Sequence, residues 1–158
     1  MYDSIACVWA LRGFPLSIVL KKSLMKIFMV GKYLHANSFI PIDRENPREG
    51  VKAINKASER IASGKTSVLI CPEGTRSGGY EMGEFHNGSF KIALKAKCPI
   101  VPAMFLKKPR IFRKTRIIIG KSFEMESFYD KKLTDEDISY LDQVLSDKMK
   151  EQHNLLKE

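Results

Sequence analysis

Long apolar runs are absent from this sequence. Apolar stretches such as residues 8–11 and 17–20 stop at Arg12 and Lys21, whereas a helix that spans a bilayer needs roughly 20 apolar residues. The start of the chain also lacks the basic and then apolar pattern of a secretory leader. We therefore expect neither a transmembrane segment nor a signal peptide.

Cysteines are few and widely separated. The three thiols, Cys7, Cys71 and Cys98, form no C-x-x-C pair and have no histidine partners at the spacing of a zinc site. An odd number of distant cysteines is typical of a protein kept in a reducing compartment. The sequence predicts buried thiols, a cytoplasmic setting and no metal site.

Acidic residues are outnumbered by basic ones. The 18 Asp and Glu stand against 27 Lys and Arg, for a formal charge of +9. Such an excess favours partners that carry phosphate, namely nucleic acid, anionic lipid headgroups or a phosphorylated substrate. The sequence has no helix-turn-helix or zinc pattern and no strand on which aromatic and basic residues alternate, so nucleic acid is disfavoured.

The chain has the size and composition of one compact domain. Its 158 residues are 44% hydrophobic and 28% charged, which is enough for a core but leaves no room for a second domain of ordinary size. No internal repeat or low-complexity tract interrupts it. We expect a single domain over residues 1–158.

Strand and helix patterns alternate along the chain. Strands are expected at residues 17–20, 38–42, 67–71, 100–106 and 116–119, and helices at residues 3–11, 22–30, 48–63 and 89–96 and from residue 134 onward. Residues 67–71 and 100–106 read as strands buried on both faces, as in parallel sheets. Pro41 restricts its strand to an edge or a strand end. This alternation predicts an α/β layered domain with its site at the carboxyl ends of the strands.

Two of the helices have further sequence signals. The helix at 48–63 should bury one apolar face and end at Gly64; that face consists of Val51, Ile54, Ala57, Ile61 and Ala62. The last helix should open with a capping box at residues 134–137. Its expected inner face consists of Ile138, Leu141, Leu145 and Met149.

A carboxylate, a glycine and a guanidinium follow the strand at 67–71. Residues 71–77 read Cys-Pro-Glu-Gly-Thr-Arg-Ser. Arg76 can hold a phosphate through two hydrogen bonds, Gly74 lets backbone N–H groups approach an anion, and Glu73 can orient Arg76 or accept a hydroxyl proton. The same residues also suit an ordinary turn with a solvated ion pair, and the local pattern alone does not separate the two.

Three motifs in order resemble those of the glycerolipid acyltransferases, the 1-acylglycerol-3-phosphate acyltransferase family. Residues 72–77 are similar to the family's third motif, with Cys71 in place of its usual phenylalanine. Residues 39–44, Phe-Ile-Pro-Ile-Asp-Arg, resemble the second motif, and residues 100–103, Ile-Val-Pro-Ala, resemble the fourth. The resemblance implies a mixed, mostly parallel sheet flanked by helices. It also implies that Arg44, Glu73, Gly74, Thr75 and Arg76 bind the substrate.

The first motif is represented only by its end. The family pattern is Asn-His-x-Ser-x-x-Asp, in which the histidine is the general base and the aspartate orients its ring. Residues 1–3 match the last three positions, so the resemblance implies that Asp3 orients a histidine that would lie three residues before Met1. Asp3 also suits the N-cap of a helix. We therefore expect a chain that is truncated at its N-terminus, lacks the first strand and has little activity by itself.

A further departure lies downstream of the third motif. Residues 85–88 read Phe-His-Asn-Gly where the family commonly has Phe-Lys-x-Gly. His86 thus replaces a lysine expected near the phosphate, and a substrate contact by His86, beside Gly88, is about as plausible as a surface role. Lys91 in the following helix could compensate, although an ordinary solvated lysine explains it equally well.

The resemblance implies a reaction as well as a fold. The family transfers a fatty acyl group from coenzyme A or acyl carrier protein to the free hydroxyl of lysophosphatidic acid, with no metal or other cofactor. The expected setting is the cytoplasmic face of a membrane, to which basic residues around Ile111 and Phe112 would bind through anionic headgroups. Two alternatives remain open: a non-catalytic module that binds lipid phosphate, and an acyltransferase for a related lysolipid.

Overall fold

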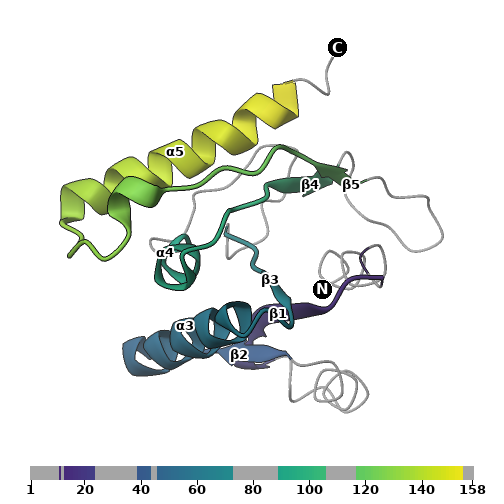
Figure 1. The fold of residues 1–158 in the computed structure, drawn as a ribbon, viewed down its shortest axis with the longest axis vertical. Helices are drawn as coiled ribbons and strands as arrows, with labels where there is room; N and C mark the ends of the chain where they lie inside the picture. Colours follow the sequence, from purple (N-terminus) through teal and green to yellow (C-terminus); the bar gives the residue numbers. More distant parts are fainter. Residues whose placement is uncertain are drawn as a thin grey trace. The chain divides into compact units, whose positions relative to one another are not determined.

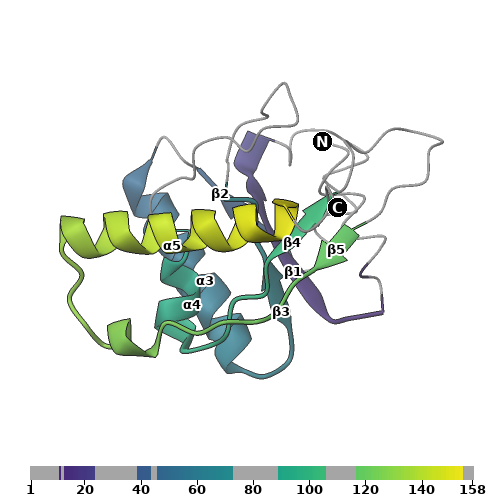
Figure 2. The same ribbon diagram turned by 90° about the horizontal axis from the view of Figure 1, so that it is seen from above.

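The computed structural model describes residues 11, 13–23, 39–43, 46–72, 89–105 and 117–154. These residues group into two compact units, Gly13–Cys71 and a second unit of Met1–Arg12 with Pro72–Glu158. Each is described by itself below (Figures 1 and 2). The expectation of a single domain stays a prediction.

The Gly13–Cys71 unit contains a parallel sheet. Its strands are β1 (Leu16–Lys21), β2 (Ile40–Ile42) and β3 (Ser67–Leu69), in the order β2-β1-β3. In the register, Lys21 pairs with Ile42, and Ile18 pairs with Leu69. The parallel arrangement confirms the α/β prediction for this part of the chain.

The middle strand, β1, forms the core of this sheet. Ser17, Ile18 and Val19 are all buried, and because successive side chains of a strand point to opposite faces, both faces of β1 are covered. Ser17 accepts a hydrogen bond of 3.0 Å from Arg60, so its hydroxyl is not buried without a partner. Pro41 is exposed and lies on β2, an outer strand of the three. An outer strand suits proline, because proline has no N–H to donate to a second neighbouring strand.

The strand expected at residues 67–71 is shorter and less buried than predicted. β3 ends at Leu69; Ser67 and Cys71 are exposed, and Val68 is half-buried. The prediction of burial on both faces is therefore wrong. Within the described sheet, β3 pairs with β1 along one side and is the last strand in the order, which leaves it less enclosed than β1.

Helix α3 (Pro47–Ala62) packs against this sheet (Figure 1). It ends as predicted, since Gly64 follows with a left-handed φ of 69° and donates its N–H to the carbonyl of Ile61. The predicted buried face is only partly right. Ala53 and Ala57 are buried one turn apart, whereas Val51 is 56% exposed and Ala62 is exposed. Small side chains at the contact let the helix approach the strands closely.

In the second unit, the described residues form a short antiparallel pair of strands and three helical segments. Helix α4 (Lys91–Ala96) is followed by β4 (Ala103–Phe105) and β5 (Ile117–Ile119), which pair with Met104 opposite Ile118. The 3₁₀ helix η2 (Glu126–Phe128) then leads to α5 (Asp135–Asn154). Val101 is 51% exposed, so the prediction that residues 100–106 are buried on both faces is wrong. An antiparallel pair needs to be covered on one face only.

Helix α5 begins with the predicted capping box. The Asp137 N–H donates to Thr134 Oγ1 at 3.2 Å, and the Thr134 N–H donates to Asp137 Oδ2 at 3.0 Å. Leu141, at 1% exposure, joins Phe90, Leu94 and Met125 in the core of this unit. Leu145 and Met149 are also buried, which confirms most of the predicted inner face.

Other predictions have mixed outcomes. Cys71 is exposed and Cys98 is half-buried, so the prediction of buried thiols is wrong for these two, and Cys7 lies outside the described residues. The helix expected at residues 3–11 and most of the helix at 22–30 also lie outside them. Among the residues that the structure describes, no helix is long and apolar enough to span a bilayer.

Candidate functional site

The predicted site residues lie in segments that the structure does not describe. This applies to Asp3 and Arg44, to residues 73–76, and to His86 and Gly88. The sequence predictions for these side chains therefore stay predictions. What the structure describes is the framework from which the segments containing Arg44 and residues 73–76 start.

Two of these segments leave the same edge of the parallel sheet. The last residue of β2, Ile42, is followed by Asp43 and Arg44, and the last residue of β3, Leu69, is followed by residues 70–72 and Glu73. Since β2 and β3 both run parallel to β1, their carboxyl ends point to the same edge, with Leu69 level with Ile18 and Ile42 level with Lys21. Ligands of open α/β sheets bind at this edge.

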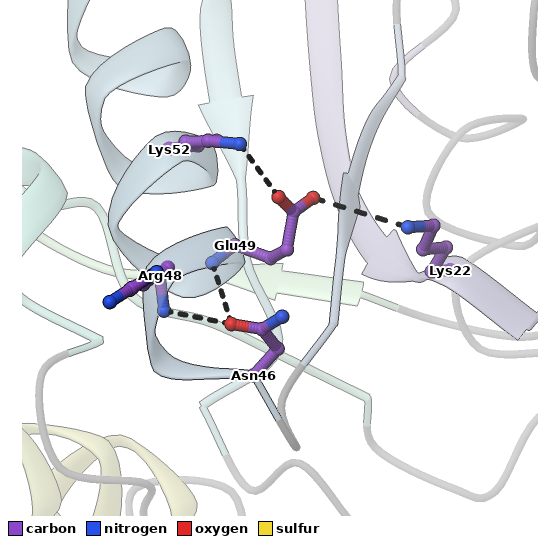
Figure 3. Close-up of polar contacts among 5 residues, drawn as sticks. All are labelled: Lys22, Asn46, Arg48, Glu49 and Lys52. Carbon is purple, nitrogen blue, oxygen red and sulfur yellow. Dashed lines mark hydrogen bonds and ion pairs between the residues drawn. The ribbon is translucent and has the colours of Figure 1, made fainter.

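The start of helix α3 lies at the same edge. Asn46 caps the helix by accepting N–H groups from Arg48 at 3.1 Å and Glu49 at 3.4 Å (Figure 3). Glu49 in the first turn then reaches Lys22, directly after β1, with Nζ 4.0 Å from its carboxylate. This ion pair joins the helix start to the end of the middle strand.

Glu49 is shared between two lysines. Lys52, one turn further along α3, donates to the other carboxylate oxygen of Glu49 at 2.9 Å (Figure 3). The hydrogen bond and charge of Lys52, with a smaller effect from Lys22, lower the pKa of Glu49 and keep it ionised. Lys22, Lys52 and Glu49 thus form a three-residue ion-pair cluster at this edge, in which two ammonium groups share one carboxylate.

Lys21 and Lys22 are candidate site residues that the sequence reasoning did not select. Lys21 is the last residue of β1 and lies in register with Ile42 at the end of β2. The signal was present as two consecutive lysines directly after a β-branched run. Their place at the site edge becomes evident only once β1 is known to be the middle strand of a parallel sheet.

The fourth motif is within the described residues. Ile100 forms an isolated antiparallel bridge with Phe123, and Pro102 is buried and accepts the Gly120 N–H at 2.9 Å. A proline fits here because its carbonyl makes the cross-strand bond while its missing N–H is not needed. Lys91, considered as a substitute for the lysine that His86 replaces, begins α4 and is half-buried.

Known proteins match much of the chain. The family model described as Acyltransferase matches residues 1–106. The 1-acyl-sn-glycerol-3-phosphate acyltransferase of Pseudomonas aeruginosa is 37% identical over 94 residues, which are 58% of this chain and 37% of that protein. The enzyme of the same name from Saccharomyces cerevisiae is 33% identical over 97 residues, which are 59% of this chain and 32% of that protein.

One solved structure has the same fold. The crystal structure of the 1-acyl-sn-glycerophosphate (LPA) acyltransferase PlsC from Thermotoga maritima matches with a TM-score of 0.64 at 21% identity, covering 90% of this chain and 57% of that one. This likeness confirms the α/β fold with a parallel sheet flanked by helices. The matched region spans about a third of the length of each of the two curated relatives. Because the family model matches well over half of its residues, the chain belongs to the acyltransferase family.

Proposed function

We propose that this protein transfers a fatty acyl group from a thioester to the free hydroxyl of lysophosphatidic acid, giving phosphatidic acid. The donor would be carried by coenzyme A or acyl carrier protein. The observation that carries the proposal is the parallel sheet, because the carboxyl ends of β2 and β3 lead directly to Arg44 and to residues 73–76. The names of the two curated relatives support the same acceptor.

The phosphate of the acceptor would be held by arginines and lysines. Arg44 and Arg76 offer planar guanidinium groups that bind two phosphate oxygens at once. Lys21 and Lys22, at the end of β1, would add positive charge at the same edge. Glu73, Gly74 and Thr75 would shape the loop around the phosphate, with a further contact from His86 beside Gly88.

The acceptor hydroxyl becomes a better nucleophile when a general base takes its proton. A histidine of the family's first motif would take the hydroxyl proton, and Asp3 would hold that histidine in the correct tautomer. The hydroxyl oxygen then attacks the thioester carbonyl, the carbon–sulfur bond breaks, and the departing thiolate takes the proton from the histidine and leaves as the free thiol. The thioester is already an activated acyl donor, so the proposal includes no metal or other cofactor.

Binding of lysophosphatidic acid tests the phosphate half of the proposal. Arg44→Ala and Arg76→Ala should each weaken binding to vesicles that contain lysophosphatidic acid by about 10- to 100-fold, as expected for the loss of a charge-assisted hydrogen bond. Lys65→Ala is the control, since Lys65 is an exposed basic residue just before β3, at the amino ends of the strands, and should leave binding nearly unchanged. Equal losses in all three variants would contradict a specific phosphate site.

The rate of acyl transfer tests the catalytic part of the proposal. The 158-residue chain, assayed alone with acyl thioester and lysophosphatidic acid, should be slower by about 10²- to 10⁴-fold than the same chain extended upstream to include the histidine motif. Asp3→Asn in the extended chain should lower the rate without weakening binding. If both the 158-residue chain and the extended chain bind lysophosphatidic acid without acyl transfer, the non-catalytic lipid-phosphate module is favoured. If the extended chain acylates another lysolipid faster than lysophosphatidic acid, that lysolipid is the acceptor.

A further inference from the structure

A hollow in the second unit has a lining that the proposed reaction does not use. Its volume is about 450 Å³, and α4 and the segment from Phe128 to the start of α5 form its walls. The described residues that line it are Lys91, Leu94, Lys95, Phe128, Asp130, Lys131, Lys132 and Leu133. All of these residues belong to the same compact unit.

The described lining of this hollow is rich in basic residues. It contains four lysines and one aspartate; Asp130 is paired with Lys97 and Lys131 with Asp137, and both of these partners lie outside the described lining. Lys91 and Lys95 are four residues apart on α4, and like charges at this spacing repel each other across one turn. Within the described part of the chain, neither Lys91 nor Lys132 has a carboxylate within ion-pair distance.

One lysine of the hollow is held in a defined position. Lys131 Nζ lies 2.8 Å from the Asp137 carboxylate and 5.3 Å from the centre of the Phe128 ring. The Phe128 ring in turn stacks on Tyr140 of α5, with centroids 5.9 Å apart. These contacts hold this wall of the hollow against α5. Because the side chains are already ordered, a ligand would lose less free energy by ordering them on binding.

Apolar side chains also line the hollow. Leu94 is largely buried in the core, while Leu133 and Phe128 are half-buried and pack against that core. A ligand that occupied the hollow would therefore have both lysine ammonium groups and apolar side chains within reach. This combination differs from an ordinary solvated lysine surface, because both kinds of contact converge on one concave site.

We propose that this hollow binds a phosphate-bearing ligand, with its phosphate oxygens on the lysines and an apolar portion on Leu94, Phe128 and Leu133. Phosphate suits the site better than a single carboxylate, because a phosphate monoester or diphosphate carries more charge and more acceptor oxygens for ammonium groups that come from two segments. The phosphate belongs either to a soluble ligand or to a lipid headgroup. The argument for this site uses neither Arg44 nor Arg76, so it does not rest on the proposed reaction.

Titration with pyrophosphate tests the soluble source. In ¹⁵N NMR spectra of the 158-residue chain, amide shifts should move saturably at residues 91–96 and 128–133. The variant Lys95→Gln/Lys132→Gln should bind roughly 30-fold more weakly, at the roughly fivefold per basic residue found near anionic surfaces. Lys121→Gln/Lys150→Gln is the matched control, because it removes two exposed lysines of the same unit that lie outside the hollow.

Vesicles test the lipid source. Sedimentation with phosphatidylglycerol vesicles, compared with phosphatidylcholine vesicles, should show a loss of binding in Lys95→Gln/Lys132→Gln that the control variant does not share. A selective loss in either assay supports the site and identifies the source of its phosphate. If neither assay distinguishes the two variants, or if Arg44→Ala/Arg76→Ala abolishes the shifts at residues 91–96, the proposal is overturned.

Discussion

At the scale of single residues, Asp137 links the start of α5 to the wall of the basic hollow. Its carboxylate accepts hydrogen bonds from the Thr134 N–H and hydroxyl and from Lys131. The hydrogen bond from Lys131, followed by that from the Thr134 N–H, lowers the pKa of Asp137 from 3.8 to about 2. The sequence predicted the capping box, but it did not indicate that Lys131 would share the carboxylate.

This depressed pKa predicts a loss of stability in acid. Between pH 3.8 and about 2, the unfolded chain binds a proton at Asp137 more readily than the folded chain does, so the free energy of unfolding should fall as the pH falls through that window. Urea denaturation at pH 5, 4, 3 and 2 measures this change. Asp137→Asn should be less stable than the wild type at pH 5, and the difference should shrink toward pH 2. A difference that stays constant with pH would contradict the assignment.

At this scale the sequence offered candidate site residues only where it contained a recognisable motif. The motif at residues 72–77 led to the family, whereas Lys21 and Lys22 belong to no recognised motif and depend on strand order for their meaning. Strand order arises from contacts between residues far apart in the chain, such as Leu16 with Ser67. Local patterns do not contain that information.

At the scale of elements, periodicity predicted the existence of helices better than their buried faces. Helix α3 spans nearly the residues expected, yet its contact with the sheet uses Ala53 and Ala57, while Val51 faces solvent. Hydrophobicity alone favours the larger side chain, but a close approach between helix and sheet favours the smaller one. Strand β3 shows a related failure. Its apolar run predicted full burial, but β3 is an outer strand of the described sheet and is therefore less enclosed.

The N-cap of α3 provides a test at this scale. Asn46→Ala should lower the free energy of unfolding by about 1 kcal/mol, within the range of roughly 0.5–2 kcal/mol for such caps, because the Arg48 and Glu49 N–H groups lose their acceptor. Asn46→Asp retains an acceptor oxygen and should be close to the wild type. Urea denaturation compares the two variants, and equal losses in both would argue against the capping role.

At the scale of the whole molecule, the formal charge of +9 favours anionic surfaces without selecting one. The densest basic segment in the sequence surrounds Ile111 and Phe112, and it lies outside the described residues. Its proposed role in membrane binding therefore rests on sequence alone. Fold class, by contrast, could be predicted for the whole chain, because it depends on the alternation of strands and helices and not on any one side chain.

Vesicle binding separates this segment from the general charge. Lys107→Gln/Lys108→Gln should weaken binding to phosphatidylglycerol vesicles by about 2 kcal/mol, at about 1 kcal/mol for each basic residue near the surface, and higher salt should reduce the difference. The charge-matched variant Lys121→Gln/Lys150→Gln should change binding much less. The same loss in both variants would mean that net charge, and not this segment, determines membrane affinity.

The order of strands in the sheet also has a consequence for synthesis of the chain on the ribosome. Of the three described strands, β1 is made before β2 and β3, yet it pairs with β2 on one side and β3 on the other, and Leu16 finds its partner Ser67 only 51 residues later. Until that segment has left the exit tunnel, the nascent β1 has one unpaired side, which can pair with other chains. Because such distant pairings close slowly, we expect completion of this sheet to limit the folding rate of the Gly13–Cys71 unit.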